Sequence, residues 1–517
     1  MIQEKRTHTR ADCLVWAALA AILLAGCAVR LWGLGAMPHG LNQDEASEFY
    51  EAYSLLHYGM DRNGVHNPVQ FISWGSGQNV GYAWLCMPFF ALLGPTNFAG
   101  RLPMALVGCL SIWVMYCLAK QWFGRGKALV FAAVLALAPW HIMKSRWALE
   151  SNLLPDVLLL GVCLLVYYLY RQRLPWLIGA MAAFAFACYC YGTSYFVLPL
   201  FLLPAAVIML VKKQGKPTHL AIGAGVFGVL ALPMILFVLV NNFDLPAITT
   251  PLFSIPKLYE NRSELMFSLL NGGFAETIRG GWEGLKNLVL TGADISGSNL
   301  QLMRGFGVCY LVTFPFFLVG IAASFRRPAK GEYLMQLWLG IGLLLAFLAE
   351  FNANRINALW VPVIYFTARG LALLPRRWCQ GACGVLAALF LLFCVRYFGP
   401  EHQAAMNYEM ADGYQQCLDA VAEDEGDIYI TGEINMPYIY VLLHERYDPN
   451  EYLATRHIAT EGIGFESVMD VGRWHFYLPD EFVEGSVFIT TAAQADAYPD
   501  EAYTKETHGM YRVIREK

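Results

Sequence analysis

Long apolar stretches, separated by short polar segments, follow one another along most of the chain. A helix of about 20 apolar residues is long enough to cross the hydrocarbon core of a bilayer. The pattern predicts about eleven membrane-spanning helices, at residues 13–33, 102–120, 128–143, 153–170, 176–191, 193–211, 219–240, 306–324, 333–350, 356–373 and 379–398. A further apolar run at 82–93 is too short to span comfortably, and it indicates a helix that lies along the membrane interface.

Basic residues set the expected orientation of these spans, because short loops rich in Lys and Arg stay in the cytoplasm. Lys5, Arg6 and Arg10 precede the first span, so the N-terminus is expected on that side. The cytoplasmic loops that follow from this start are all basic: 120–127, 171–173, 212–216, 326–330 and 376–377. An odd number of spans then places the C-terminal end outside, as in a multi-pass protein of the plasma membrane.

Three external segments are longer than a simple connection requires, and long loops are usually functional or disordered. They are the first external loop at 33–101, a second long loop at 241–305 and the C-terminal part at 400–517. Short strand-like runs and one apolar helical run in 400–517 predict a small α/β domain outside the membrane. The chain is thus expected to divide into a polytopic α-helical membrane domain at 1–399 and this extracytoplasmic domain.

Composition agrees with a polytopic membrane protein, since 57% of the residues are hydrophobic, 15% are charged and the mean hydropathy is +0.43. The net charge of −4 hides an asymmetry, because residues 400–517 contain 23 acidic and 7 basic side chains. Basic residues are scattered over loops, so a nucleic-acid partner is not expected. Most of the 13 cysteines lie in apolar spans, where Cys packs as a small hydrophobic residue. No metal-ligand pattern emerges; the sequence names no cofactor and leaves a divalent metal ion open.

Two adjacent carboxylates, Asp44 and Glu45, follow the first span by about a dozen residues. Acidic residues are scarce and costly in a membrane domain, and this pair is expected close to the lipid headgroups on the outer side. A carboxylate that faces a water-filled cleft can act as a general base toward a hydroxyl or amine. The alternative is that both acids complement the dipole of a helix N-terminus that Asn42 caps.

Four more residues are candidates for contact with a phosphate or another substrate group. Arg146 and Glu150 can form an i,i+4 salt bridge, or Arg146 can bind a lipid phosphate. Arg355 lies among three asparagines at an outer helix end, where it can extend its side chain to the interface or hold a phosphate. Arg101 opens the second span and is either an interfacial anchor or a substrate contact.

Several of these motifs together resemble a known family. Gln43-Asp44-Glu45-Ala46 and the run 94–106, with Arg101-Leu102-Pro103-Met104-Ala105-Leu106, look like the GT-C superfamily of membrane glycosyltransferases. The similarity is greatest to the branch with protein O-mannosyltransferases and the lipid A aminoarabinose transferase, so the chain resembles glycosyltransferase family 39. Leu93-Gly94-Pro95 replaces the usual Leu-Phe-Gly. The runs 138–146 and 354–362 also fit the family, and the resemblance covers about the first 400 residues.

The resemblance implies an inverting glycosyltransferase that uses a polyprenyl- or dolichyl-phosphate sugar. Asp44 matches the family's catalytic Asp, Glu45 matches its partner, and Arg101 matches the arginine of the family motif before the second span. The expected partners are the lipid-linked donor, membrane lipids and an extracytoplasmic acceptor, which is a protein, a cell-envelope glycan or a lipid. The sugar, the acceptor and the oligomeric state are left open.

Two other functions compete with this interpretation. A transporter or flippase of a lipid-linked sugar would also contain charges and broken helices, but it should show charges near mid-membrane and two matching halves. A non-catalytic scaffold for glycan assembly would keep the fold without the chemistry. A nucleotide-sugar donor is disfavoured, because the two acids are expected on the side where such donors are absent.

Overall fold

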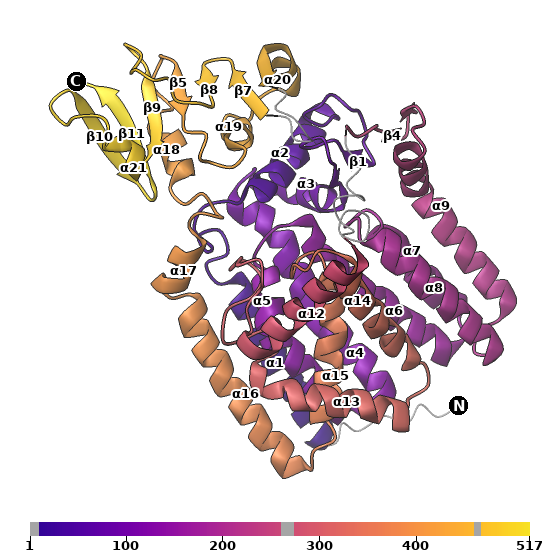
Figure 1. The fold of residues 1–517 in the computed structure, drawn as a ribbon. Coiled ribbons are helices and arrows are strands. Elements are labelled where there is room, and N and C mark those ends of the chain that lie inside the picture. The colour runs from indigo at the N-terminus through magenta and orange to yellow at the C-terminus, as the bar shows by residue number, and fades with distance from the viewer. Residues whose placement is uncertain (1–9, 260–272, 460–466) are drawn as a thin grey trace.

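A helical bundle with a small sheet domain at one end makes up the protein, as the ribbon in Figure 1 shows. The computed structural model describes residues 10–259, 273–459 and 467–517. Lys5 and Arg6, which the orientation argument uses, lie outside the described residues. The bundle helices are α1 (Arg10–Leu31), α2 (Gln43–Tyr58), α3 (Gly81–Leu93), α4 (Asn97–Leu137), α5 (Pro139–Lys144), α6 (Leu154–Arg171), α7 (Leu174–Ala187), α8 (Ser194–Val211), α9 (Pro217–Asn242), α12 (Phe274–Thr291), α13 (Phe314–Arg326), α14 (Tyr333–Leu348), α15 (Trp360–Leu371) and α16 (Arg376–Tyr397).

Short elements join these helices. One 3-10 turn precedes each of α6, α13 and α15, and two short hairpins lie in the long outer segments. The turns are η1 (Glu150–Leu153), η2 (Leu311–Thr313) and η3 (Asn357–Leu359), and the hairpins pair β1 (Gln70–Phe71) with β2 (Gln78–Asn79) and β3 (Ile248–Thr249) with β4 (Ser254–Ile255).

Six of the described helices are long and apolar enough to cross a membrane: α1, α4, α6 with η1, α8, α9 and α16. Four more are apolar but shorter: α3, α7, α13 with η2, and α14. A helix occupies each of the predicted spans, and the chain is mostly helical, as expected of a polytopic membrane protein. The number of crossings itself stays a prediction.

The 41-residue element α4 consists of two helices that meet at Gly124, inside the segment 120–127 where the sequence predicts a basic loop between two spans. Only Gly124 departs from helical geometry, with φ 79° and ψ 170°, a conformation that is essentially restricted to glycine. Arg125 next to it pairs with Asp12 of α1 at 2.6 Å. The two helices therefore join within the predicted loop, and the rings of Phe123 and Phe131 on either side of Gly124 lie 5.3 Å apart.

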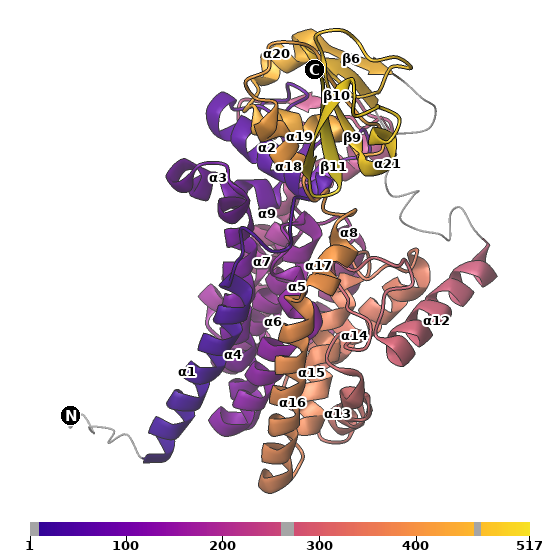
Figure 2. The same ribbon diagram turned by 90° about the vertical axis from the view of Figure 1, so that its left-hand side faces the viewer.

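The second long segment also contains more structure than expected. Residues 274–291 of the predicted loop 241–305 form α12, while 260–272 lie outside the described residues. The short apolar run at 82–93 is a helix, α3, which lies across one end of the bundle beneath α2 (Figure 2). Tyr82 and Cys86 on one face are buried, whereas Leu92 is 82% exposed.

The C-terminal part forms a seven-stranded sheet with the strand order β10-β11-β9-β5-β8-β7-β6. The strands are β5 (Ile428–Ile430), β6 (Arg456–Ala459), β7 (Ser467–Val471), β8 (Trp474–His475), β9 (Val487–Thr491), β10 (Tyr503–His508) and β11 (Tyr511–Glu516). Helices α17 (Pro400–Met406), α18 (Tyr414–Ala420), α19 (Pro437–His444), α20 (Pro449–Thr455) and α21 (Ala492–Ala495) accompany it. The strand-like runs seen in the sequence coincide with β5, β8, β9 and β11.

The sheet domain is attached to α2 by direct hydrogen bonds. The hydroxyls of Tyr50 and Tyr53 donate to the carbonyls of Tyr447 and Arg446, at 3.0 and 3.1 Å. Nearer the start of α2, the backbone N–H of Leu41 donates to a carbonyl of the 407–413 segment at 2.7 Å. The helix that begins with the two predicted catalytic acids therefore lies between the bundle and the sheet domain.

Candidate active site

Asn42 caps the N-terminus of α2, as the structural alternative for the acidic pair predicts. Its side-chain oxygen accepts the backbone N–H of Asp44 at 3.0 Å. The side chain of Glu45 accepts the backbone N–H of Asn42 at 3.3 Å, which completes a capping box. Capping fixes the backbone of this turn, and it leaves the side chain of Asp44 outside the reciprocal pair.

Glu45 is buried and forms a bidentate pair with Arg101 of α4. The two contacts, from Nε and Nη2 of Arg101, measure 2.9 and 2.8 Å, and both side chains are fully buried. The other N–H groups of Arg101 donate to the carbonyls of Leu34, Pro38 and Gly40. The guanidinium thus has its donors directed at protein atoms, and its predicted contact with a substrate phosphate stays a prediction.

A third segment also meets the carboxylate of Glu45. The backbone N–H of Ala148, beyond α5, donates to Oε1 of Glu45 at 2.8 Å. One buried carboxylate therefore joins the start of α2, the start of α4 and the segment after α5. An arrangement of this kind fixes the positions of these three segments relative to one another, because a buried charge is stable only with such partners.

Asp44 has different surroundings, since it is only partly buried. Its backbone carbonyl accepts Nε2 of Gln78 at 3.4 Å, and the side-chain oxygen of Gln78 accepts the hydroxyl of Ser47 at 2.7 Å. Asp44 and Glu48 are four residues apart on α2, so they share one face of the helix. The row of acids on this face runs from the partly exposed Asp44 into the interior.

Glu48 is fully buried, and neither of its carboxyl oxygens has a hydrogen-bond partner of ordinary geometry among the described residues. Burial raises the pKa of Glu48 well above its ordinary value, and the carboxyls of Glu150, Glu51 and Asp44 add to the rise. Glu150, which was predicted to bind the donor phosphate or substrate with Arg146, is buried at 3% exposure and close enough to Glu48 to act on its pKa. Its predicted role stays a prediction.

Arg146 lies beyond the end of α5 at Lys144, so it does not share a helical face with Glu150. Its Nη1 donates to the carbonyls of Val29 and Arg30, at 2.9 and 3.1 Å, near the C-terminal end of α1. A cation is favourable at that end of a helix, where carbonyl groups lack intrahelical partners. Its predicted contact with a phosphate is left untested by this geometry.

Arg355 is the most accessible of the predicted cations, with a side chain that is 33% exposed and paired with Glu350. The residue before it, Asn354, accepts Nε2 of Gln301 at 2.9 Å and the hydroxyl of Ser151. Ser151 follows Glu150 in the chain. The structure therefore brings the loop of Arg355 next to the loop of Glu150, although 200 residues separate them.

Sequence reasoning missed a buried row of charges that begins at Arg30 in α1. Nη2 of Arg30 donates to Nδ1 of His141 at 2.7 Å, so Nε2 of His141 holds the hydrogen and donates to Asp156 at 3.0 Å. Lys144 also pairs with Asp156 and donates to the carbonyl of Asn152. Arg30 and Asp156 stand inside predicted spans, and a charge within an apolar run was the available signal.

A second missed cation, Arg62, packs against the face of α2 that carries Ser47 and Glu51. Arg62 donates to the hydroxyl of Ser47 at 2.7 Å and pairs with Glu51 at 3.1 Å. Its guanidinium lies over the ring of Trp74, 4.4 Å from the centroid. Arg62 had no sequence signal, because a lone arginine in a polar loop is usually solvated.

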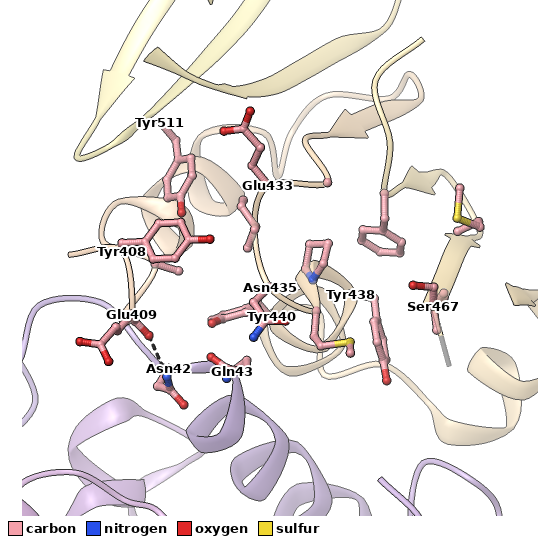
Figure 3. A pocket seen from close by; sticks show the side chains of 18 residues that line it. Asn42, Gln43, Tyr408, Glu409, Glu433, Asn435, Tyr438, Tyr440, Ser467 and Tyr511 are labelled. Atoms are coloured by element: carbon pink, nitrogen blue, oxygen red, sulfur yellow. Dashed lines mark hydrogen bonds between the residues drawn. The ribbon is translucent and has the colours of Figure 1, made fainter. Parts of the chain in front are cut away.

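A polar pocket of about 500 Å³ lies between the start of α2 and the sheet domain (Figure 3). Asn42 and Gln43 contribute its floor, directly before Asp44. The remaining wall comes from residues after position 407, among them Tyr408, Asn435 and Tyr440. Sequence analysis assigned no role to this part of the chain, because the pocket joins segments that are far apart in sequence.

A second cavity is an apolar groove of about 440 Å³ along the bundle. Residues of α12, α14 and α15 line it, together with the segment 306–317. Leu359 and Trp360 lie in its wall, four and five residues after Arg355. Within the part of the chain that the structure describes, no three His, Cys, Asp or Glu side chains come together in a way that could hold a metal ion.

Comparison with known proteins connects this geometry to a family. Residues 78–241 match the family model described as dolichyl-phosphate-mannose-protein mannosyltransferase. Over 137 residues the chain is 32% identical to YycA of Bacillus subtilis (strain 168), a provisionally named mannosyltransferase. That match spans 26% of this chain and 20% of YycA, so it covers about a fifth of that relative's length.

Solved structures extend the likeness to nearly the whole chain. ArnT from Cupriavidus metallidurans, solved alone and bound to undecaprenyl phosphate, aligns over 98% of both chains with a TM-score of 0.56 and 14% identity. The archaeal oligosaccharyltransferase AglB from Archaeoglobus fulgidus, in complex with an inhibitory peptide and a dolichol-phosphate, aligns over 84% of this chain and 64% of its own. Its TM-score is 0.52 at 12% identity. The chain therefore has the fold of the GT-C membrane glycosyltransferases, and its residues 78–241 match the dolichyl-phosphate-mannose-protein mannosyltransferase family.

Proposed function

We propose that this chain is an inverting glycosyltransferase that moves a sugar from a polyprenyl-phosphate donor to an extracytoplasmic acceptor. The observation that supports this most directly is the start of α2 in a GT-C fold. Asp44 lies partly exposed beside a polar pocket, while its neighbour Glu45 is buried and paired with Arg101. A catalytic base needs this combination of access for one acid and a fixed backbone around it.

The proposed reaction is a single displacement at the anomeric carbon. An acceptor hydroxyl attacks that carbon, and the carboxylate of Asp44 takes its proton. The bond between the anomeric carbon and the phosphate oxygen breaks, and the electron pair leaves with the polyprenyl phosphate. Glu45 and Arg101 act as positioning residues, because their buried contacts hold Asp44 in place without facing the pocket.

Arg355 is the best-placed residue to bind the departing phosphate. It is partly exposed, whereas the donor groups of Arg101 and most of those of Arg146 are bonded to protein atoms. The apolar groove with Leu359 and Trp360 in its wall offers a place for the polyprenyl chain. Undecaprenyl phosphate in ArnT and dolichol-phosphate in AglB are ligands of the same chemical kind in proteins of this fold.

The orientation that accompanies this function is also part of the proposal. About eleven helices cross the plasma membrane, the N-terminus is cytoplasmic, and residues 400–517 form an extracytoplasmic domain. In Figure 2 the N-terminal end of α1 and the sheet domain lie at opposite ends of the bundle, as an odd number of crossings requires. The helix α3 would then lie along the outer interface.

The deciding experiment combines donor choice with one substitution. The purified chain in detergent should transfer sugar from a polyprenyl-phosphate sugar and not from the corresponding nucleotide sugar. Asp44→Asn keeps the shape of the side chain but cannot accept the proton at neutral pH, so turnover should fall by about 10²- to 10⁴-fold. Radiolabelled sugar released from, or transferred out of, the lipid fraction measures both effects.

Asp244→Asn is the matched control, since Asp244 is exposed and pairs only at the surface with Lys257. It should retain full activity. Turnover of Asp44→Asn within about twofold of the unmodified chain would assign the base elsewhere. Transfer from a nucleotide sugar without a lipid intermediate would overturn the donor class, and movement of the lipid-linked sugar across a vesicle bilayer without transfer would indicate a transporter.

A further inference from the structure

The polar pocket lies where the topology of the sheet favours a ligand. β5 pairs in parallel with β9 on one side and with β8 on the other. Ligands of open α/β sheets bind outside the carboxyl ends of the strands, at the point where connections leave toward opposite sides. Residues 432–437, after β5, and Phe476, after β8, line the pocket. The sheet domain thus presents this edge to α2.

The opposite wall places the pocket next to the proposed base. Asn42 and Gln43 immediately precede Asp44, and the side-chain amide of Asn42 donates to the carbonyl of Glu409 at 2.7 Å along one side of the cavity (Figure 3). Tyr440 also lines the pocket; burial raises its pKa well above the usual value, and the carboxyls of Asp44 and Glu45 add to the rise. A molecule in this pocket therefore has one end beside Asp44.

The lining combines aromatic rings with amide and hydroxyl groups, and its only charged members are acidic. Tyr408, 71% exposed, and Asn435 are accessible uncharged groups of the lining. Glu409 and Glu433 are the charged ones, and no described lining residue is Lys, Arg or His. Residues 400–517 as a whole contain 23 acidic and 7 basic side chains. An anionic ligand would be repelled here, because no cation compensates for its charge.

We propose that this pocket binds the acceptor, and that the acceptor is the end of an uncharged carbohydrate chain. The inference rests on the transferase function proposed above, and it names the substrate class for that function. Sugar rings present apolar C–H faces to aromatic rings and hydroxyls to amide and carboxylate groups, which is the chemistry of this lining. A phosphorylated lipid or glycan lacks the cations that it would need.

The geometry is less suitable for a polypeptide acceptor. Extended peptides commonly bind by adding a strand to the edge of a sheet. The pocket instead lies beyond the carboxyl end of β5, with residues of β7 in its wall, and its lining includes no residue of the edge strands β10 and β6. Its volume of about 500 Å³ is in the range of sites for compact ligands. A chain end fits such a cavity better than an extended segment does.

A binding experiment tests the inference without turnover. The full chain with Asp44→Asn, in detergent, is titrated with cellotetraose, mannotetraose and chitotetraose, and with the 6-phosphate of each, by saturation-transfer NMR or calorimetry. At least one neutral saccharide should bind, and its phosphorylated form should bind more weakly. Tyr408→Ala and Asn435→Ala should each weaken binding by about fivefold to tenfold, while Asn450→Ala, an exposed asparagine outside the pocket, should not.

The charge argument has its own variant. Glu433→Lys should reduce the ratio between the Kd of the phosphorylated saccharide and the Kd of the neutral one. Glu481→Lys, which changes an exposed residue away from the pocket, should leave this ratio unchanged. Preference of the unmodified chain for a phosphorylated saccharide or for a Ser/Thr-containing peptide would overturn the inference. Equal binding by the Tyr408→Ala and Asn435→Ala chains and their control would do so too.

The two proposals fail in different ways. Transfer from polyprenyl-phosphate sugar to a peptide or to a phosphorylated lipid would leave the transferase function intact and would refute the carbohydrate acceptor. Pocket-dependent binding of a neutral saccharide, without any transfer from polyprenyl-phosphate sugar, would refute the transferase function and keep the carbohydrate site.

Discussion

At the scale of single residues, Asp44 and Glu45 are neighbours in sequence with opposite surroundings. Asp44 is partly exposed at the first turn of α2, while Glu45 is enclosed by Arg101, the backbone of Ala148 and the backbone of Asn42. Burial and pairing direct the carboxylate of Glu45 at protein groups and make it a strong structural link. We therefore expect Asp44 to take part in the chemistry and Glu45 to support its position.

The buried pair leads to a prediction about stability. Arg101→Ala should lower the free energy of unfolding by about 3–5 kcal/mol, because it leaves the carboxylate of Glu45 buried without its partner. Thermal unfolding in detergent measures the change. Arg355→Ala removes an exposed pair, so it should cost about 0–1 kcal/mol and act on donor KM instead. Equal losses of stability in the two variants would contradict the assignment of Arg101 as a positioning residue.

Glu48 leads to a prediction about pH. Its folded-state pKa is raised well above the ordinary 4.5 by burial and by Glu150, Glu51 and Asp44. The folded state therefore holds a proton that the unfolded state loses first, so stability from this group is complete below about pH 4.5 and is lost as pH rises. The unfolding temperature should fall from pH 5 upward, and Glu48→Gln should show a smaller fall.

Glu350→Gln provides the control for the pH series, since Glu350 is exposed on the outer loop. Its unfolding temperature should follow that of the unmodified chain at every pH. Part of the slope should remain in Glu48→Gln, because burial raises the pKa of Glu51 to about 8 and that of Asp61 to about 6. Parallel curves for Glu48→Gln and the unmodified chain would show that Glu48 is not protonated in the folded state.

At the scale of elements, α4 supplies a matched pair of glycines. Gly124 has φ 79° and ψ 170°, where a side chain is strained, and Gly126 lies within the helix with nothing near its missing Cβ. Gly124→Ala should destabilise the protein by about 1–3 kcal/mol. Gly126→Ala should be neutral or stabilise by up to about 1 kcal/mol. Thermal unfolding of both variants compares them, and equal effects would mean that the bend is not restricted to glycine.

The positions of the membrane helices follow from apolar runs, and α2 and its acids could be anticipated from the same pattern. The tight turn in α4 could not, because the polar and basic residues at 120–127 usually signal a longer loop, whereas the structure keeps all of them but Gly124 in helical geometry. Helix α12 was not predicted for a related reason. It has one apolar face and several glycines, so its composition resembles that of a loop.

For the candidate site, the sequence could predict some residues but not the groups that surround them. Asp44, Glu45 and Arg101 could be identified because they stand close to spans and form motifs. Their partners could not, since Ala148 and the wall of the pocket are brought to α2 by tertiary packing alone. Asp156 stood inside an apolar run, which was a usable signal, whereas Arg62 in a polar loop offered none.

At the scale of the whole molecule, orientation is open to direct measurement. Residues in the basic segments, such as Lys213, should be cytoplasmic, and Asn450 in the sheet domain should be extracytoplasmic. Single cysteines at these two positions, in a chain without its own 13 cysteines, should differ in labelling of intact cells. A membrane-impermeant maleimide should modify position 450 and spare position 213. The reverse pattern would invert the topology.

The segment 407–413 connects α17 with α18, and it also forms part of the pocket wall that faces Asn42 and Gln43. Tyr408, Glu409 and Ala411 line the cavity, while the carbonyls of Glu409 and Met410 accept bonds from Asn42 and Leu41. An exchange of the C-terminal domain between relatives at residue 414 would leave this wall behind. Acceptor specificity in such chimaeras would depend on both the segment 407–413 and the domain that follows it. A domain exchange that transfers the whole wall must therefore begin at residue 407.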